Sequence, residues 1–130
     1  SIFGYLDRQD KLIEYIKNKK RLLINEPRLK QDFISINYLN KILLCILKKK
    51  KYKNFDIYNC SSNIGVTPSE IISLLPYEIL KEKTIKFKPV NNQNLSKRKK
   101  VCIGSNKKII NNLKIKKLLI TKEIKEYLLN

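Results

Sequence analysis

Residues 55–75, FDIYNCSSNIGVTPSEIISLL, decide how the rest of the sequence is organised. The first part, residues 55–59, predicts a short strand that runs into a loop. Within residues 61–65, SSNIG, the residues Ser61, Ser62, Asn63 and Gly65 predict the loop itself. Residues 67–75 begin with a helix-capping sequence and continue with apolar residues. The stretch therefore predicts a strand, a loop and a helix in that order.

The helix start is the most specific signal within this stretch. Thr67 is the predicted N-cap, Pro68 takes the first helical position, and Glu70 is placed to reach back to the cap, as in a capping box. A strand followed by a loop and a capped helix can hold an anionic ligand, or it can simply connect two elements. Both interpretations are open from the local sequence. The apolar face of this helix is Ile71, Ile72, Leu74 and Leu75.

The remaining sequence predicts short strands interspersed with helices. After Asn37, the predicted N-cap, five apolar residues recur at the spacing of a core-facing stripe, and lysines 48–51 follow. We expect a mixed α/β fold, or an α+β fragment, with four to five helices. The stripe is Leu39, Ile42, Leu43, Ile46 and Leu47. Further helices are predicted at 7–20, capped by Asp7 or Asp10, 106–112 and 121–129, and strands at 1–5, 21–25, 31–36, 84–90 and 101–103.

Composition excludes several classes of site. The chain has 130 residues, no histidine and three cysteines without a C-x-x-C spacing, so neither a histidine-based triad nor a zinc site is expected. Its three glycines form no glycine-rich phosphate loop. No apolar run approaches the ~18 residues that a membrane span needs. We expect reduced thiols, a cytoplasmic location, no membrane partner and no metal.

The net charge of +18 is high for this length. A strong positive field attracts phosphates, whether in nucleic acid or in a nucleotide ligand. The abundance of Lys, Asn and Ile, whose codons are rich in A and T, gives a compositional explanation of the same charge. The sequence leaves both explanations open.

Several motifs occur along the chain in a fixed order. They are SIFGY (1–5) with DKLI (10–13), QDFISINY (31–38), YNCSSNIGVTPSEI (58–71) and SNKKIINNL (105–113), before a final helix. This series resembles the C-terminal half of the extended short-chain dehydrogenase/reductases, the NAD-dependent sugar-nucleotide epimerases, 4,6-dehydratases and related reductases. The family motifs at these places are N-x-Y-G-P with K-L-I-P, R-D-F/W-x-Y-V-D-D, Y-N-I-G-S-G-x-G-x-S-x-x-E-I and D-x-S-K-A-x-x-x-L-G-W.

The resemblance implies that residues 1–130 form a single substrate-binding domain or fragment. The N-terminal Rossmann part, with its G-x-x-G-x-x-G loop and Tyr-x-x-x-Lys pair, is missing, so we expect no catalytic residue here and no chemistry by this chain alone. NAD or NADP would be bound by the full-length parent. The expected partners are a nucleoside-diphosphate sugar and the Rossmann half of the same protein. A homodimer is open, and nucleic acid is the second choice. The absence of methionine also leads us to expect a part of a longer or processed protein.

The resemblance also implies substrate-binding positions. Lys11 and Leu12 match the segment that lies along the nucleotide, Asn59 matches the substrate-facing Asn of the Y-N motif, and Arg98 supplies the late arginine that meets the diphosphate. Gln31 stands where the family has an arginine, and an amide does not grip phosphate as a guanidinium does. From the residues alone, Lys11 and Arg98 are equally explained as solvated charges, and Asn59 as a loop-capping amide.

Two further functions fit the same sequence. The lysine runs at 48–51 and 97–100 fit a basic structural or RNA-binding subunit of a larger complex, although no aromatic residues are interleaved with them. Ser1 and Gln31 replace the asparagine and arginine of the family motifs, which fits a degenerate, non-catalytic relative of the same enzymes.

Overall fold

Three small sheets connect the helices of the chain. The computed structural model describes residues 1–4, 11–49, 57–88 and 101–130. The central strand of the largest sheet, β3, pairs antiparallel with β5 and parallel with β7, so that Gln31 lies opposite both Val66 and Cys102. The other two sheets are the parallel pairs β1–β4 and β2–β6. The strands are β1 (Ile2–Phe3), β2 (Arg21–Ile24), β3 (Lys30–Asp32), β4 (Ile34–Ser35), β5 (Gly65–Val66), β6 (Thr84–Phe87) and β7 (Val101–Cys102).

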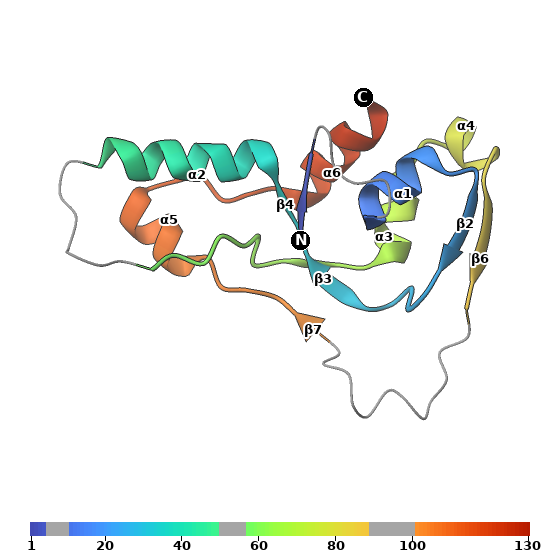
Figure 1. The fold of residues 1–130 in the computed structure, drawn as a ribbon, viewed down its shortest axis with the longest axis horizontal. Coiled ribbons are helices and arrows are strands. Elements are labelled where there is room, and N and C mark those ends of the chain that lie inside the picture. Colours follow the sequence, from blue (N-terminus) through green and yellow to red (C-terminus); the bar gives the residue numbers. More distant parts are fainter. Residues whose placement is uncertain (5–10, 50–56, 89–100) are drawn as a thin grey trace.

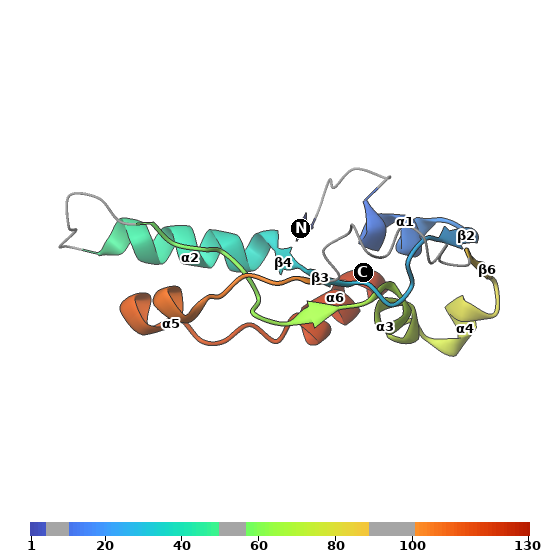
Figure 2. The same cartoon turned by 90° about the horizontal axis from the view of Figure 1, so that it is seen from below.

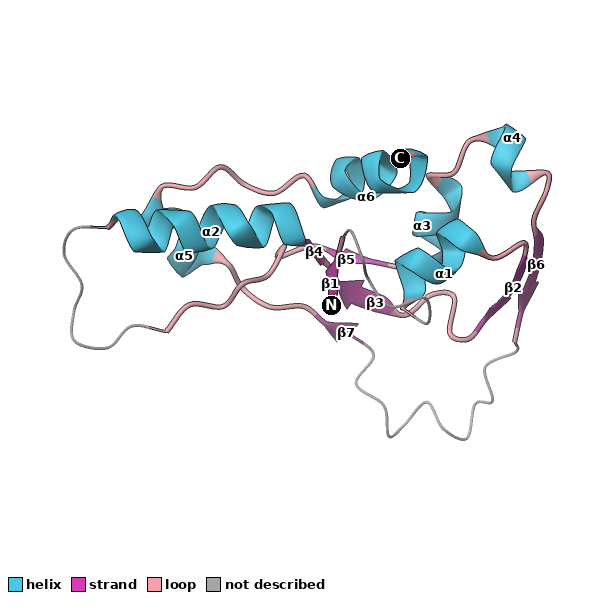
Figure 3. Cartoon of the chain, turned by 45° about the horizontal axis from the view of Figure 1, so that its top comes forward, coloured by secondary structure: helices cyan, strands magenta, loops and turns pink. Residues whose placement is uncertain are grey.

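The helices form two groups along an elongated body. One group, α1, α3 and α6, packs together near the middle, while α2 and α5 lie side by side at one end (Figures 1 and 2). The β2–β6 pair and α4 lie at the opposite end (Figure 3). The helices are α1 (Leu12–Asn18), α2 (Ile36–Lys48), α3 (Pro68–Ser73), α4 (Tyr77–Leu80), α5 (Lys107–Leu113) and α6 (Ile120–Leu129).

The mixed α/β class is confirmed, with one helix more than the four to five expected. The five predicted helices are found among the described residues, and α4 is the addition. Pro76 follows the preceding helix and serves as the N-cap of this further single turn. No helix among the described residues is long and apolar enough to cross a membrane.

One continuous core joins the helices to the sheets. In β2 the side chains alternate, with Leu22 and Ile24 buried and Arg21 and Leu23 exposed, as expected for a strand with one covered face. Gly4 lets β1 approach α2 closely, since a Cβ there would lie 2.3 Å from the Cγ2 of Ile36. The most completely buried side chains are Ile13, Ile16, Leu22, Ile24, Ile42, Val66, Pro68, Ile71, Ile109, Leu118, Ile120 and Ile124.

The capping box of α3 is confirmed atom by atom. The backbone N–H of Glu70 donates to Thr67 Oγ1 over 3.1 Å, and the backbone N–H of Thr67 donates to Glu70 Oε2 over 2.7 Å. Pro68 occupies the first helical position. The strand predicted at residues 55–59 is wrong where the structure describes the chain. Residues 57–59 are not a strand, and the strand before α3 is β5. Residues 55 and 56 lie outside the described part.

The start and the buried face of α2 differ from the prediction. Ser35 rather than Asn37 is the N-cap, because its Oγ accepts the backbone N–H of Tyr38 over 3.1 Å. Ile42 of the expected stripe is fully buried, but Leu43 and Leu47 are 47% and 77% exposed. The core contacts the side of the helix that carries Tyr38 and Ile42, which leaves the other apolar side uncovered.

Two other elements have boundaries that differ from the prediction. The predicted strand 31–36 is divided, because the chain leaves one sheet after Asp32, buries Phe33, and enters another sheet at Ile34. The helix predicted to begin at residue 7 begins at Leu12, with Lys11 as N-cap and no side-chain cap bond. The predicted caps at positions 7 and 10 lie outside the described residues.

Candidate binding site at strand β3

A hollow of about 710 Å³ opens beside β3. Its main walls are β3 itself, the loop that precedes β5, and the chain that follows β7, and Ser1 and Ile34 of β4 complete the lining. We call it the β3 hollow. Gln31 contributes an amide from the strand, Tyr58, Asn59 and Ser61 contribute polar groups from the loop, and Gly104 lies on the third wall.

The carboxylate of Asp32 holds the three walls together. Its Oδ1 accepts hydrogen bonds from the backbone N–H of Ser62 over 2.8 Å and from the Ser62 hydroxyl over 2.7 Å. Its Oδ2 accepts the backbone N–H of Gly104 over 2.9 Å. Bonds from backbone N–H groups to an ionised carboxylate are among the stronger hydrogen bonds in proteins. Asp32 is therefore a structural clamp at the base of the site.

The floor of the β3 hollow is tightly packed around Ser61. Ser61 is 7% exposed, and the side-chain amide of the buried Asn106 donates to its carbonyl over 3.2 Å. A Cβ on Gly104 would lie 2.8 Å from the Ser61 Cβ, so a glycine is needed there. Within the described part of the chain the Ser61 Oγ has no hydrogen-bond partner, which is unusual for a buried hydroxyl.

Two of the five predicted substrate-binding residues meet in this hollow. Gln31 and Asn59 come from separate motifs and line the same space. Lys11 lies away from its lining, with Nζ 3.4 Å from the carbonyl oxygen of Ile2, and Leu12 packs against the core. Arg98 lies outside the described residues.

Sequence reasoning missed the residues that build the site. Asp32 fell within the strand predicted at 31–36, and Ser62 within the predicted loop at 61–65. Their pairing joins positions thirty residues apart, and only the fold brings them together. The available signal was the run of small residues at 61–65, which predicted a tight loop but no partner for it.

Cys60 brings a thiol to the lining of the β3 hollow. Although this residue is exposed over much of its surface, desolvation of the covered part raises the pKa of its thiol. The neutral thiol is then the prevailing form at neutral pH, which is a poor nucleophile. No cluster of residues that would hold a metal occurs in the described ranges.

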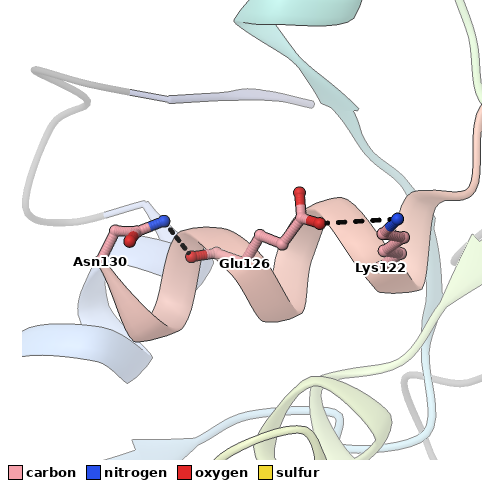
Figure 4. A network of polar contacts seen from close by, with 3 residues as sticks. All are labelled: Lys122, Glu126 and Asn130. Atoms are coloured by element: carbon pink, nitrogen blue, oxygen red, sulfur yellow. Dashed lines mark hydrogen bonds and ion pairs between the residues drawn. The ribbon is translucent and has the colours of Figure 1, made fainter.

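A second hollow of about 620 Å³ lies between α2 and α6. Its floor includes Tyr38, whose hydroxyl donates to the carbonyl of Lys116 over 3.0 Å. Burial, and then the nearby charge of Glu123, raises the pKa of Tyr38. On α6, Lys122 pairs with Glu126 at 3.8 Å, and Asn130 donates to the Glu126 carbonyl (Figure 4). Four lysines line this hollow: Lys41, Lys116, Lys117 and Lys122.

The described chain thus has a mixed α/β fold, with a polar hollow where a strand, a loop and a later segment meet. No protein-family model matches the chain, and no curated protein matches it. A solved structure, that of RMD from Pseudomonas aeruginosa complexed with NADPH, has a similar fold with a TM-score of 0.64 and 17% identity. The similarity covers 91% of this chain and 37% of RMD, so the chain spans well under half of that protein.

Proposed function

We propose that this chain is the nucleotide-sugar-binding part of an NAD(P)-dependent enzyme of the extended short-chain dehydrogenase/reductase type. The observation that carries the proposal is the meeting of Gln31 and Asn59 in one hollow. They stem from the two motifs that resemble the substrate-binding motifs of that family. The lining offers the amides of Gln31 and Asn59 as hydrogen-bonding groups, and the carboxylate of Asp32 on it is already bonded to Ser62 and Gly104.

The similarity to RMD supports the proposal at the level of the fold. RMD was solved with NADPH, and this chain corresponds to 37% of its length. In the proposed protein, a dinucleotide-binding part supplies NAD or NADP and the catalytic residues. The present chain supplies the surface that holds the nucleoside-diphosphate sugar, and the two parts together form the complete active site.

The test is direct binding of nucleoside-diphosphate sugars to the full chain by calorimetry. UDP-glucose, dTDP-glucose and GDP-mannose serve as probes, because the sequence does not name the base. Asn59→Ala should weaken binding about five-fold, the usual effect of losing one neutral hydrogen bond. Asn40→Ala is the matched control, since Asn40 is an exposed asparagine on α2. Equal affinity of both variants would remove Asn59 from the site, and no binding of any probe would refute the proposal.

A second function rests on the hollow between α2 and α6. Its four lysines, together with a net charge of +18, favour binding of a nucleic-acid backbone. Glu123 and Glu126 on the same lining count against it, because their negative charges offset two of the four positive charges, Glu126 by pairing with Lys122. An affinity for RNA that falls steeply with added salt would support this function, whereas a degenerate enzyme relative would bind neither RNA nor sugar nucleotide.

A further inference from the structure

Two lysines, one at the end of α2 and one in α5, converge on Tyr58 at the wall of the β3 hollow. Lys49, directly after α2, has its Nζ 6.0 Å from the centre of the Tyr58 ring and 3.3 Å from its hydroxyl. Lys108, in the first turn of α5, has its Nζ 5.0 Å from the same ring centre and donates to the carbonyl of Ile57 over 2.8 Å. The side-by-side packing of α2 and α5 creates this arrangement (Figure 2).

The amides of Gln31 and Asn59 are uncharged. On the same lining the negative charge of Asp32 opposes the positive charge of Lys30, so these side chains together do not neutralise a diphosphate. We infer that Lys49 and Lys108 bind the diphosphate of the ligand, beside the hollow that takes its uncharged parts. The inference rests on the proposed function. A diphosphate that reaches both ammonium groups is attracted to each of them.

Tyr58 prepares the two lysines for this role. A lysine side chain loses much rotational freedom when it grips a phosphate, and that loss weakens binding. Contact with the face of an aromatic ring attracts an ammonium group and restricts its positions before the ligand arrives. Lysine also serves as a phosphate-binding point charge where no guanidinium is available. The pair thus supplies the positive charge that Gln31 lacks.

The experiment compares two double variants of the full chain by calorimetry. Lys49→Gln with Lys108→Gln removes both cations at Tyr58. Lys48→Gln with Lys107→Gln removes two exposed cations from the neighbouring positions, so the change in net charge is the same. The probes are UDP-glucose, dTDP-glucose and GDP-mannose, their nucleosides, and inorganic pyrophosphate.

The first double variant should bind the sugar nucleotides and pyrophosphate about ten-fold or more weakly, because it loses charged hydrogen bonds. It should bind the nucleosides like the unchanged chain. The second double variant should stay within about two-fold for every probe, since Lys48 and Lys107 are not the lysines that lie over the Tyr58 ring and exposed, screened charges contribute little. Lys49→Arg with Lys108→Arg should restore most of the affinity, and thermal unfolding of all variants reports whether the fold is intact.

Each result has a distinct meaning. If sugar nucleotides bind and the two glutamine double variants behave alike, the inference is wrong while the proposed function stands. If only pyrophosphate binds, and the change at positions 49 and 108 abolishes it, the anion site stands and the proposed function fails. If the unchanged chain binds neither, both fail. A loss of nucleoside binding in the first double variant would show a general distortion of the hollow and overturn the inference.

Discussion

Asp32 joins three segments of the chain through the two oxygens of one carboxylate. The backbone N–H groups of Ser62 and Gly104 both donate to it, at 2.8 and 2.9 Å. Neither residue lies in a helix, where a backbone carbonyl would accept its N–H. The carboxylate of Asp32 accepts both groups instead. A clamp of this kind fixes the walls of the β3 hollow before any ligand binds, which reduces the ordering that binding would otherwise require.

Replacing Asp32 by alanine should therefore lower the free energy of unfolding by about 3 kcal/mol, because buried donors lose a charged acceptor. Asp32→Asn should lower the free energy of unfolding by less, since its carbonyl oxygen still accepts one set of hydrogen bonds. Some loss remains, because its amide nitrogen faces an N–H donor and cannot accept from it. Urea unfolding followed by circular dichroism measures both. Asn59→Ala is the control and should change stability by less than about 0.5 kcal/mol, as an exposed loop position. An alanine at position 32 that unfolds like this control would show that Asp32 is no clamp.

The capping box of α3 gives a prediction about pH. Hydrogen bonds from the Thr67 backbone N–H and hydroxyl lower the pKa of Glu70 from its ordinary value of 4.5. A carboxyl whose pKa is lower in the folded state stabilises the fold above its unfolded pKa, and this stabilisation disappears as the pH falls through the folded value. Stability should thus decline below about pH 4.5 in part through Glu70.

Glu70→Gln removes that titration while it keeps a similar shape. The difference in unfolding free energy between the unchanged chain and this variant should be largest at neutral pH and shrink on acidification. Glu78→Gln is the matched control, as the first-turn glutamate of α4, a helix whose start carries no side-chain cap bond. A difference at Glu70 that does not depend on pH would contradict the assignment.

At the scale of elements, α2 shows which structural features a sequence pattern predicts and which it does not. The capping box at Thr67 is local, so its residue types and spacing were enough to predict it. The periodicity of α2 was also correct, but apolar residues occupy two sides of this helix, and periodicity does not say which side meets the core. The choice depends on where α5 lies, and its contact with α2 joins residues far apart in the sequence.

Sequence pattern also did not determine the N-cap of α2 or the composition of the β3 hollow. Both Ser35 and Asn37 are residue types that serve well as N-caps, and Ser35 is the N-cap because β4 ends there and the helix begins at the next residue. Gln31 and Asn59 were selected by motif, yet that they share a hollow follows only from the pairing of β3 with β5 and from the clamp at Asp32. Long-range pairings of short strands leave almost no signal in a single sequence.

The observed face of α2 is tested by two alanine substitutions. Ile42→Ala should cost about 3 kcal/mol, because it leaves a cavity at a fully buried position. Leu47→Ala should change the free energy of unfolding by less than about 0.5 kcal/mol, since Leu47 is 77% exposed and alanine favours helices. The predicted core stripe would have made both changes costly. Chemical denaturation with matched protein concentrations measures the two, and equal losses would favour the stripe over the structure.

At the scale of the whole molecule, the charge of +18 acts on the fold and on ligand binding with opposite signs. Repulsion among many cations destabilises a compact chain, and salt screens this repulsion. The attraction of a phosphate to Lys49 and Lys108 is screened by the same salt. The Debye length falls from about 30 Å at 0.01 M salt to about 10 Å at 0.1 M, so this range of salt weakens both interactions. The two effects are distinguished by sign, because weaker repulsion raises stability whereas weaker attraction lowers affinity.

Raising sodium chloride from about 0.01 M to 0.1 M should therefore increase the urea midpoint of the chain and weaken its binding of pyrophosphate. The Lys48→Gln with Lys107→Gln variant, having two fewer positive charges, should show a smaller gain in stability but the same loss of affinity. The Lys49→Gln with Lys108→Gln variant should show the smaller gain in stability and almost no salt dependence of its residual binding. If salt lowered the midpoint, attractive ion pairs rather than net repulsion would dominate the surface. If the binding of both variants kept an equal salt dependence, the attraction would come from the diffuse charge of the molecule and not from the two lysines at Tyr58.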